Sequence, residues 1–481
     1  MHSSTLLSTS ILVTATLAAN TAKAVHLPLN RRDKSTALTS LNGTTPITAT
    51  SFGSVFDTEV KFGDQTFQLF IDTGSSDTWV VQKDFQCVNR TSGLDLPRDA
   101  CLYGPSSYDP SKSAGYEEIP DEIFGIQYGD GIASGLMAYE NITLAGMTVR
   151  QKVGLANVST PMGDGINSGL LGIGYPALTS AHPGPFQDNT TYWFNRLPYD
   201  PLLFTMADQG LIEPYYSLAI ARTPQNSTTG FGGYLTLGGL APVNHSAEWA
   251  TLPVEIHETI PENFTSGKHV ISYWTTTIDG FKYGPASANT QRENSNLTTD
   301  TTRTQVFFDN GNHFSFFPDA VLAPINALFE PPAVWNAELS IYVLQCDAVA
   351  PTFGITLANQ TFFHDGRDLV YQTEEGICVS NLVPSETVGI DGITLNIVGA
   401  GFFKNVLGVF DFGKNEMRFA SLVGEVVEGL EGQGQGGPDG QAESPNNGTG
   451  TAQGNAASSV AGNMIATGLG VCFMSLMVAL W

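Results

Sequence analysis

Basic residues are few in this sequence. Only 21 of its 481 residues are Lys or Arg, against 46 Asp or Glu, which gives a formal net charge of −25. A surface with such an acidic excess repels phosphate backbones and argues against nucleic acid as a partner. The acidity fits either simple solubility or work in acid, where many carboxylates would be protonated, and charge alone does not decide between the two.

Cysteine is also scarce, and no Cys-x-x-Cys or His/Cys spacing occurs, so we expect neither a metal nor a cofactor. One of the five cysteines, Cys472, lies in an apolar C-terminal tail. The other four allow three pairings. They form two clusters far apart in the sequence, which favours the pairs Cys87–Cys101 and Cys346–Cys378, one in each half of the chain.

Helix-like stretches are few and short, and residues 320–329 are one example. The 51 glycines and 26 prolines are spread along the chain and indicate many turns between short strands. Polar and apolar side chains alternate over residues 58–62. Gly63-Asp64 then makes a turn, and an apolar run over 66–71 follows, so the segment predicts a β-hairpin. Further strand-like runs occur at residues 234–237, 273–281 and 406–410. The fold class is therefore mainly β, and the length predicts two domains or lobes.

The N-terminus resembles an export signal. A modest apolar run before Ala22-Lys23-Ala24 predicts a signal peptide over residues 1–24, followed by a short leader over 25–45 with a dibasic site at Arg31-Arg32. Eleven Asn-x-Ser/Thr sequons support a glycosylated secretory protein. Their asparagines are Asn42, Asn89, Asn141, Asn157, Asn189, Asn226, Asn244, Asn263, Asn296, Asn359 and Asn447.

The C-terminus combines a polar linker over residues 429–455 with a largely apolar end over 456–481. A transmembrane helix is one interpretation, but no basic residue follows the apolar run to hold it on the cytosolic side. Small residues, a polar spacer and a terminal apolar run are typical of a glycosylphosphatidylinositol signal. We therefore expect a lipid anchor attached at Asn455, or nearer Gly450, and a location at the plasma membrane or cell wall, or otherwise in the extracellular space.

An Asp-x-Gly sequence occurs in a similar setting in each half. An apolar run ends in Asp72-Thr73-Gly74, and residues 170–172 (LLG) come about one hundred positions after Asp72. In the second half an apolar run ends in Asp309-Asn310-Gly311, and residues 397–399 (IVG) come about ninety positions after Asp309. The same order at nearly the same spacing predicts a duplicated lobe. We assign the N-terminal lobe to residues 46–240 and the C-terminal lobe to 241–428.

Two lobes facing each other across a pseudo-twofold axis would bring Asp72 and Asp309 into contact. Adjacent carboxylates cannot both ionise cheaply, so such a pair shares one proton. One carboxylate then acts as a base and the other as an acid, which is the equipment for activating a water molecule against a peptide carbonyl. A single Asp-x-Gly is mostly a turn, and it is the second copy that favours catalysis.

Residues 70–81 (FIDTGSSDTWVV) resemble the first active-site motif of the pepsin family of aspartic proteases. Residues 126–131 (IQYGDG) resemble that family's flap, residues 169–176 its conserved loop, and residues 397–399 with 409–420 its C-terminal signature. The resemblance covers about residues 48–423 and is closest to lipid-anchored fungal members. It implies a bilobal fold with the active site in a cleft between the lobes, monomeric endopeptidase activity on polypeptides, and no cofactor.

The resemblance also implies roles for individual residues. Asp72 and Asp309 would hold the attacking water, Ser75 would hydrogen-bond Asp72, Tyr128 would close over the substrate, and Trp79 would steady Tyr128. The supporting residues of the two motifs and the flap are Thr73, Gly74, Gly129, Asp130, Gly311 and Asn312.

The second motif departs from the family's usual Asp-Thr/Ser-Gly-Thr/Ser, because Asn310 and Asn312 stand in the hydroxyl positions. In the family these hydroxyls join the active-site loops and orient the second carboxylate. An amide also donates hydrogen bonds, so we expect Asn312 to take over the orientation of Asp309, and His313 to point outward.

The sequence leaves three candidate functions. The first is an acid-active endopeptidase at the cell surface. The second is a binding protein on the same fold whose catalysis is impaired by the altered motif. A third, a structural wall glycoprotein, leaves the flap and the Asp72 motif unexplained.

Overall fold

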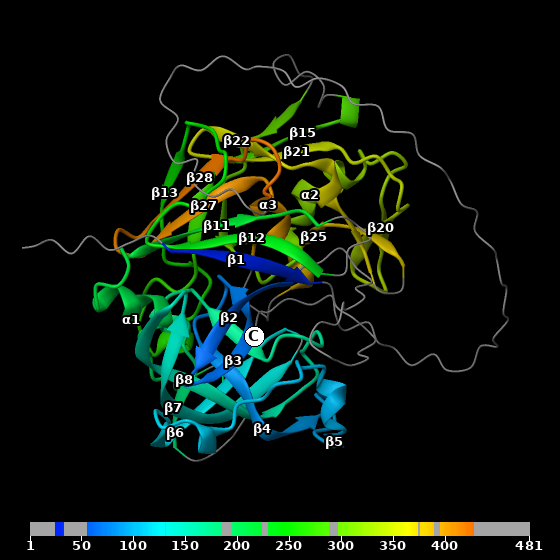
Figure 1. Cartoon of the computed structure of the whole chain (residues 1–481). Helices are drawn as coiled ribbons and strands as arrows, with labels where there is room; N and C mark the ends of the chain where they lie inside the picture. The colour runs from blue at the N-terminus through cyan, green and yellow to red at the C-terminus, as the bar shows by residue number, and fades with distance from the viewer. Residues whose placement is uncertain are drawn as a thin grey trace, which may run out of the picture.

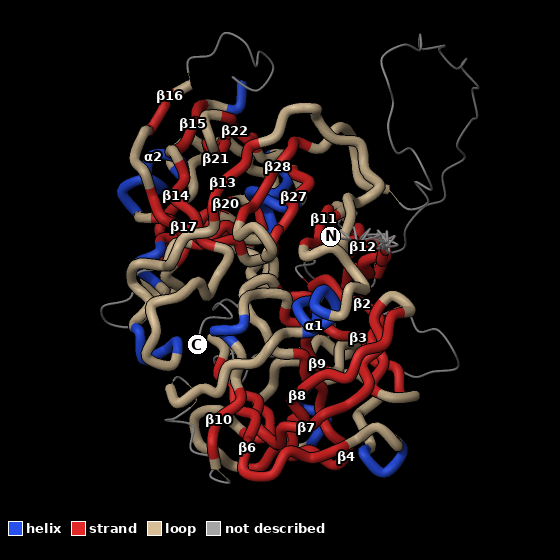
Figure 2. The backbone as a smooth tube through the Cα atoms, turned by 90° about the vertical axis from the view of Figure 1, so that its left-hand side faces the viewer, coloured by secondary structure: helices blue, strands red, loops and turns tan. Residues whose placement is uncertain are grey.

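The structure is a computed structural model. It describes residues 25–32, 55–129, 131–184, 192, 194–223, 229–287, 297–373, 376–388 and 395–427, and of residues 25–32 and 229 only the backbone. Most of the described chain is strand, and the helices are short pieces between strands (Figures 1 and 2). This confirms a mainly β fold.

One long sheet runs through the whole molecule and joins its two halves (Figure 1). Its fifteen strands are, in spatial order, β10 (Ala181–Pro183), β6 (Glu117–Gln127), β7 (Ile132–Leu144), β8 (Met147–Ser159), β4 (Thr78–Val88), β9 (Gly169–Gly172), β3 (Gln65–Asp72), β2 (Val55–Phe62), β1 (Val25–Arg32), β12 (Thr229–Leu237), β11 (Tyr215–Ile220), β27 (Val406–Asp411), β28 (Glu416–Ser421) and β13 (Ala250–Pro253), with β5 (Asp95–Leu96) paired to β4.

Three smaller sheets complete the C-terminal half. One has the order β14 (Thr275–Ile278), β17 (Thr304–Phe308), β26 (Ile397–Val398), β18 (Ser315–Phe317) and β25 (Leu382–Pro384). The second has the order β16 (Thr298–Asp300), β15 (Gly280–Gly284), β21 (Thr352–Leu357) and β22 (Gln360–Phe363), and the third β19 (Val334–Asn336), β20 (Ile341–Leu344), β24 (Cys378–Ser380) and β23 (Val370–Gln372). The α-helices of the described chain are α1 (Leu202–Asp208), α2 (Asp319–Asn326) and α3 (Ala400–Phe403).

The hairpin expected in the first half is present. β2 and β3 pair antiparallel, and Phe62 faces Gln65 across the turn. Inward-facing side chains such as Val60, Phe67 and Leu69 are almost fully buried. Their alternation with more exposed neighbours explains why this segment was recognisable as strand.

The run over residues 273–281 was predicted as one strand-like stretch, and the structure divides it. β14 pairs with β17 in one sheet, whereas β15 pairs with β21 in another. Ile278 at the end of β14 and Phe281 in β15 are both fully buried, so the pattern does not reveal that the chain changes sheets between them.

The two aspartates occupy equivalent places in the two halves. β3 ends in Asp72 and pairs in parallel with β9. β17 ends one residue before Asp309 and pairs in parallel with β26. The duplicated lobe expected from the spacing of the two motifs is therefore visible as a repeated strand arrangement.

The first part of the expected leader forms a strand. β1 lies between β12 and β2 in the long sheet, with Val25 facing Leu237 and Arg32 facing both Thr229 and Val55 (Figure 1). The rest of the leader, the signal peptide, the polar linker and the anchor signal with Asn455 lie outside the described residues. Within those residues, no helix combines the length and the apolar character needed to cross a membrane.

Both expected disulfides are formed, Cys87–Cys101 near the end of β4 and Cys346–Cys378 between the end of β20 and β24. Each closes a loop within one half, with sequence separations of 14 and 32 residues. Such a bond stabilises a protein mainly by restricting its unfolded chain.

We expect the double substitution Cys346→Ser/Cys378→Ser to lower the free energy of unfolding by about 2–4 kcal/mol, because it frees the longer of the two closed loops. Denaturant unfolding under oxidising conditions measures this. Cys87→Ser/Cys101→Ser is the comparison, since it frees the shorter loop, with a separation of 14 residues, and should cost less. An unchanged unfolding midpoint in the double variant would contradict the prediction.

Candidate active site

Asp72 and Asp309 meet where the two halves of the molecule face each other, and both side chains are fully buried. Each is fixed through its backbone to the neighbouring parallel strand. The carbonyl of Asp72 accepts a hydrogen bond from the Ile173 N–H at 2.9 Å, and the Asp309 N–H donates to the Val398 carbonyl at 3.0 Å. The sheet ladders therefore set the position of both carboxylates.

The glycine that follows each aspartate leaves room for the opposite carboxylate. A Cβ atom on Gly74 would lie 2.7 Å from Cγ of Asp309, and one on Gly311 would lie 2.5 Å from Oδ1 of Asp72. Both separations are too short for any side chain. The glycines of the two Asp-x-Gly sequences are thus required for the carboxylates to approach each other.

A reciprocal set of hydrogen bonds joins the two active-site loops. The Thr73 N–H donates to Oδ1 of Asn310 at 2.9 Å, and the Asn310 N–H donates to Oγ1 of Thr73 at 2.9 Å. The Thr73 hydroxyl also donates to the carbonyl of Phe308 at 3.0 Å, and Nδ2 of Asn310 donates to the carbonyl of Ile71 at 2.8 Å. The amide of Asn310 thus accepts and donates as the hydroxyl of Thr73 does, and all four partners are buried.

The two carboxylates have different hydrogen-bond donors. Asp72 accepts from the Gly74 N–H at 2.7 Å and from the hydroxyl of Ser75 at 2.6 Å. Asp309 accepts from the Gly311 N–H at 2.9 Å, and the Asn312 N–H, which donates to the backbone carbonyl of Asp309 at 3.3 Å, also favours the ionised carboxylate. A hydroxyl donor is therefore present on the Asp72 side, while the donors to Asp309 are backbone groups.

Asn312 does not take the expected place of the missing hydroxyl. Its Oδ1 accepts from the Phe314 N–H at 3.3 Å, and its buried Nδ2 has no hydrogen-bond partner among the described residues. The orienting contact that we expected from this amide to Asp309 is absent there, because the side chain is occupied in its own turn. Its backbone, and not its amide, supports Asp309.

The pKa of Asp309 is raised well above its usual range. Burial is the largest cause, followed by the charge of Asp72 and a hydrogen bond between the two side chains. The hydrogen bonds from Ser75 and Gly74 favour the ionised form of Asp72. The pair therefore shares one proton, and the donors to Asp72 together with the raised pKa of Asp309 favour Asp309 as its carrier.

The hairpin of β6 and β7 forms a flap beside this pair, closed by a hydrogen bond from the Tyr128 N–H to the Gly131 carbonyl at 2.7 Å. Nε1 of Trp79 donates to the hydroxyl of Tyr128 at 3.0 Å. Burial and then the charge of Asp72 raise the pKa of Tyr128, so its hydroxyl stays protonated. Gly129 lies at the flap tip, and Asp130 is outside the described residues.

Comparison with known proteins agrees with this geometry. The sequence model of the family described as eukaryotic aspartyl protease matches residues 56–422, which is most of the chain. The chain belongs to the eukaryotic aspartyl protease family. It is an aspartic-type endopeptidase with the bilobal fold, and the Asp72–Asp309 pair lies between its lobes.

Similar proteins include fungal members of the family. The protease is 35% identical over 388 residues to a probable aspartic-type endopeptidase of Aspergillus fumigatus, covering 79% of this chain and 81% of the relative. It is 24% identical to rhizopuspepsin of Rhizopus chinensis, again over 79% and 81% of the two chains. The crystal structure of an aspartic proteinase from Irpex lacteus matches with a TM-score of 0.58 at 17% identity, covering 83% of this chain and 98% of that one, which shows the fold.

The structure contradicts the predicted orientation of His313 and gives Asp77 contacts that were not predicted. His313 does not point outward but packs against Tyr371 and Phe314, with ring centroids 4.2 and 5.3 Å away. Asp77 belongs to the first active-site motif, residues 70–81, and the sequence predicted no role for it. It is buried and accepts from the Tyr199 hydroxyl at 2.5 Å and the Ser180 N–H at 2.9 Å, and burial raises its pKa.

The site of the protease is built from carboxylates, a hydroxyl, amides and backbone groups. No group of three or more side chains that could hold a metal ion lies together in the described part of the chain. The partner of Asp77, Tyr199, is more than one hundred residues away in the sequence, so no local signal could have indicated that contact.

We expect Asn310→Ala to destabilise the protease by about 1–3 kcal/mol for each buried group left unpaired, which are the Thr73 N–H and the Ile71 carbonyl. Asn310→Thr should recover most of this loss, because a hydroxyl also accepts and donates. Denaturant unfolding monitored by tryptophan fluorescence measures both variants. Equal stability of the alanine variant and the wild type would contradict the prediction.

We expect Asn312→Thr to supply the hydroxyl that Asp309 lacks, which would stabilise its ionised form and lower its pKa. The alkaline limb of the pH–activity profile should then move to lower pH. Asn312→Ala is the matched control, since it removes the same amide but adds no donor. If the pH–activity profiles of Asn312→Thr and Asn312→Ala have the same alkaline limb, the new hydroxyl does not reach Asp309.

Proposed function

We propose that this aspartic endopeptidase hydrolyses peptide bonds with a water molecule activated between Asp72 and Asp309, at acid pH and at the outer surface of the cell. The observation that carries the proposal is the desolvated carboxylate pair, in which one member receives a hydroxyl donor and the other a raised pKa. This difference assigns the two chemical roles before any substrate binds.

The mechanism follows from that assignment. Ionised Asp72 takes a proton from the water as its oxygen attacks the scissile carbonyl carbon, and protonated Asp309 gives its proton to the carbonyl oxygen. The tetrahedral intermediate, a gem-diol, then collapses with cleavage of the C–N bond. The leaving amine takes the proton that Asp72 received, and one hydroxyl of the diol returns its proton to Asp309, so that a carboxylic acid and an amine are released and the pair regains its starting state. Tyr128, kept neutral and held by Trp79, is available to donate a hydrogen bond from the flap side.

Export and anchoring rest on the sequence, and the positions of the sequons support export. The sequon asparagines within the described residues are not buried. Asn89, Asn141, Asn244, Asn263 and Asn359 are exposed, and Asn157 is half-buried. An exposed asparagine is accessible to glycosylation in the secretory pathway. With the expected signal peptide and anchor signal, this favours a monomeric, lipid-anchored protein at the plasma membrane or cell wall.

One observation favours a second candidate, a binding protein with impaired catalysis. The side-chain amide of Asn312 makes no hydrogen bond to Asp309. Against it stand the hydrogen bonds between Thr73 and Asn310, which join the two loops that carry the aspartates. The two candidates differ in whether the pair can turn over a substrate.

We expect the purified protein to cleave an unfolded protein substrate in acid, and a statine-type inhibitor to block this cleavage. Asp72→Asn removes the base and should reduce kcat by on the order of 10²–10⁴-fold. Absence of inhibitable cleavage, together with unchanged substrate binding by Asp72→Asn, would establish the binding protein instead.

We expect activity to fall as the pH rises through the pKa of Asp309, because the group then loses the proton that it must donate. The stability of the folded protein should change with pH in the same direction. A buried acid whose pKa is raised on folding stabilises the protein at low pH, and this contribution is lost as the pH rises through the folded-state pKa. Asp309→Asn should weaken this pH dependence of the unfolding midpoint. An identical dependence in that variant would place the titrating group elsewhere.

We expect the mature protein to leave the membrane fraction after treatment with phosphatidylinositol-specific phospholipase C and to lose apparent mass after deglycosylation. Asn455→Gln and a Gly450 variant, compared for retention at the surface, would distinguish the two candidate attachment sites. Retention after phospholipase treatment of all forms would favour a transmembrane tail.

A further inference from the structure

The flap contacts a loop that the catalytic proposal does not use. The disulfide Cys87–Cys101 closes this loop, which contains β5 and a short turn ahead of it. In that turn the Asn89 N–H donates to the Leu94 carbonyl and the Gly93 N–H donates to the Asn89 carbonyl, both at 2.8 Å. The disulfide and the turn fix the backbone of the intervening residues. We refer to residues 87–101 as the disulfide loop.

Arg90 extends from the disulfide loop to the flap tip. Its Nη1 donates a hydrogen bond to the carbonyl of Gly129, although the two residues are 39 positions apart in the sequence. The donor carries a charge, and charge-assisted hydrogen bonds are stronger than neutral ones. An arginine also keeps its charge over the whole pH range of a working protease. Gly129 adjoins Tyr128, so this contact acts on the flap next to its tyrosine.

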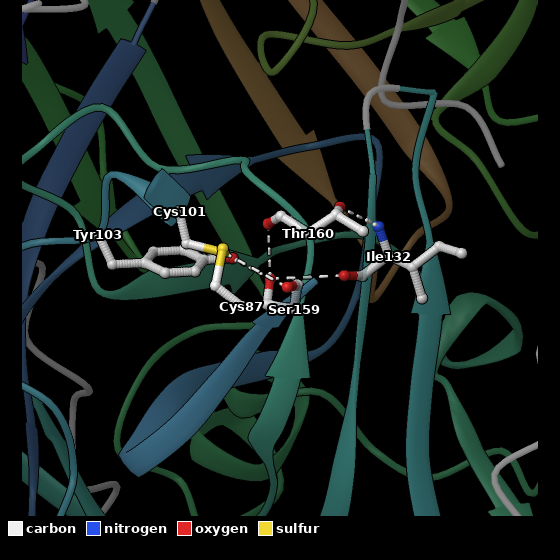
Figure 3. The surroundings of a disulfide bond; sticks show 6 residues. All are labelled: Cys87, Cys101, Tyr103, Ile132, Ser159 and Thr160. Atoms are coloured by element: carbon white, nitrogen blue, oxygen red, sulfur yellow. Dashed lines mark hydrogen bonds between the residues drawn. A yellow bond between two sulfur atoms is a disulfide. The ribbon is translucent and has the colours of Figure 1, made fainter. Parts of the chain in front are cut away.

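Cys101 of the disulfide loop and Tyr103 just after it also contact the segment that supports the flap next to its tip (Figure 3). The Tyr103 hydroxyl contacts the hydroxyl of Ser159 at 2.8 Å, and Sγ of Cys101 lies 3.3 Å from the Ser159 carbonyl. Ile132, the first residue of β7, donates through its N–H to Oγ1 of Thr160 at 2.9 Å and accepts from the Thr160 N–H at 3.0 Å. The end of the flap hairpin is therefore tied to the strand that the disulfide packs against.

Trp79 connects this support to the active site. Its ring lies edge-on to Tyr103, with centroids 6.2 Å apart, and its Nε1 donates to Tyr128. The flap is thus held at three residues at or beside its tip: Gly129 by Arg90, Tyr128 by Trp79, and Ile132 by Thr160. Of these contacts, the one from Arg90 reaches the tip from a separate loop.

We propose that Arg90 is a positioning residue of the protease, which holds the flap tip over the Asp72–Asp309 pair by its hydrogen bond to the Gly129 carbonyl, with the disulfide loop as a rigid base. The inference rests on the proposed function for its kinetic consequence. A tip already held in this position pre-organises the flap side of the substrate site, so loss of the Arg90 contact weakens substrate binding more than it slows the chemical step.

Arg90→Ala tests the inference. We expect KM to rise about tenfold or more, the order implied by losing a hydrogen bond to a charged group, while kcat changes by less than about twofold. The affinity for a statine-type inhibitor should fall by a similar factor. Arg90→Lys, which keeps a charged donor, should recover part of the lost affinity.

Arg98→Ala is a matched control from the same loop. Its guanidinium contacts Asp84 at 3.1 Å and lies 5.5 Å from the ring centroid of Phe85. Asp84 and Phe85 belong to β4, and neither is part of the flap. We therefore expect Arg98→Ala to keep the wild-type KM. Equal KM values for wild type, Arg90→Ala and Arg98→Ala would overturn the inference.

A measurement without catalysis separates this inference from the proposed function. In Arg90→Ala, amide hydrogen exchange at residues 126–132 should accelerate while the thermal midpoint and the exchange of other strands stay unchanged. If the wild type shows no inhibitable cleavage, the proposed function fails but the exchange result still tests Arg90. Unchanged exchange at the flap in Arg90→Ala would overturn the positioning role, and a general loss of protection would show a purely structural one.

Discussion

The hydrogen bonds between Thr73 and Asn310 are the constraint on which the rest of the site depends. Each residue follows an aspartate, and each fixes the backbone of the opposite loop. One long sheet joins the two halves, but Asp72 ends a strand of that sheet whereas Asp309 follows a strand of a smaller one, so neither sheet alone sets the distance between the carboxylates. An amide in one position and a hydroxyl in the other can join the two loops, because each group accepts and donates hydrogen bonds at the same time.

Burial of the carboxylates makes their small differences decisive. In water, one additional hydroxyl donor would alter a carboxylate little, but in a desolvated pair it selects which member keeps the negative charge. Ser75 has this effect on Asp72, and no side-chain donor to Asp309 is found among the described residues. The asymmetry that the altered second motif introduces therefore strengthens the division between base and acid, as long as the loops stay joined.

The sequence was informative where function depends on local order. The Asp-x-Gly turns, the hairpin of β2 and β3 and both disulfides follow from patterns in the residues, and the flap tyrosine follows from the resemblance of residues 126–131 to the family's flap. It was less informative where side chains choose among partners. The amide of Asn312 could donate to Asp309 or remain in its own turn, and only the three-dimensional arrangement decides. The contacts of Arg90 with Gly129 and of Tyr199 with Asp77 join distant segments whose residue types carry no special signal. His313 was misjudged because the ring of Tyr371 arrives from another part of the chain.

The position of β1 has a consequence for maturation. A processing protease usually binds its substrate as an extended strand through backbone hydrogen bonds. At Arg31 and Arg32 the backbone is already paired with β12 on one side and with β2 on the other. The backbone of the dibasic sequence is thus paired once the sheet has formed, so a protease that binds an extended strand would reach it only before β1 joins the sheet. A later cut between β1 and β2 would leave the β1 segment paired through its backbone with β12 and β2, as a non-covalent subunit of its own protein.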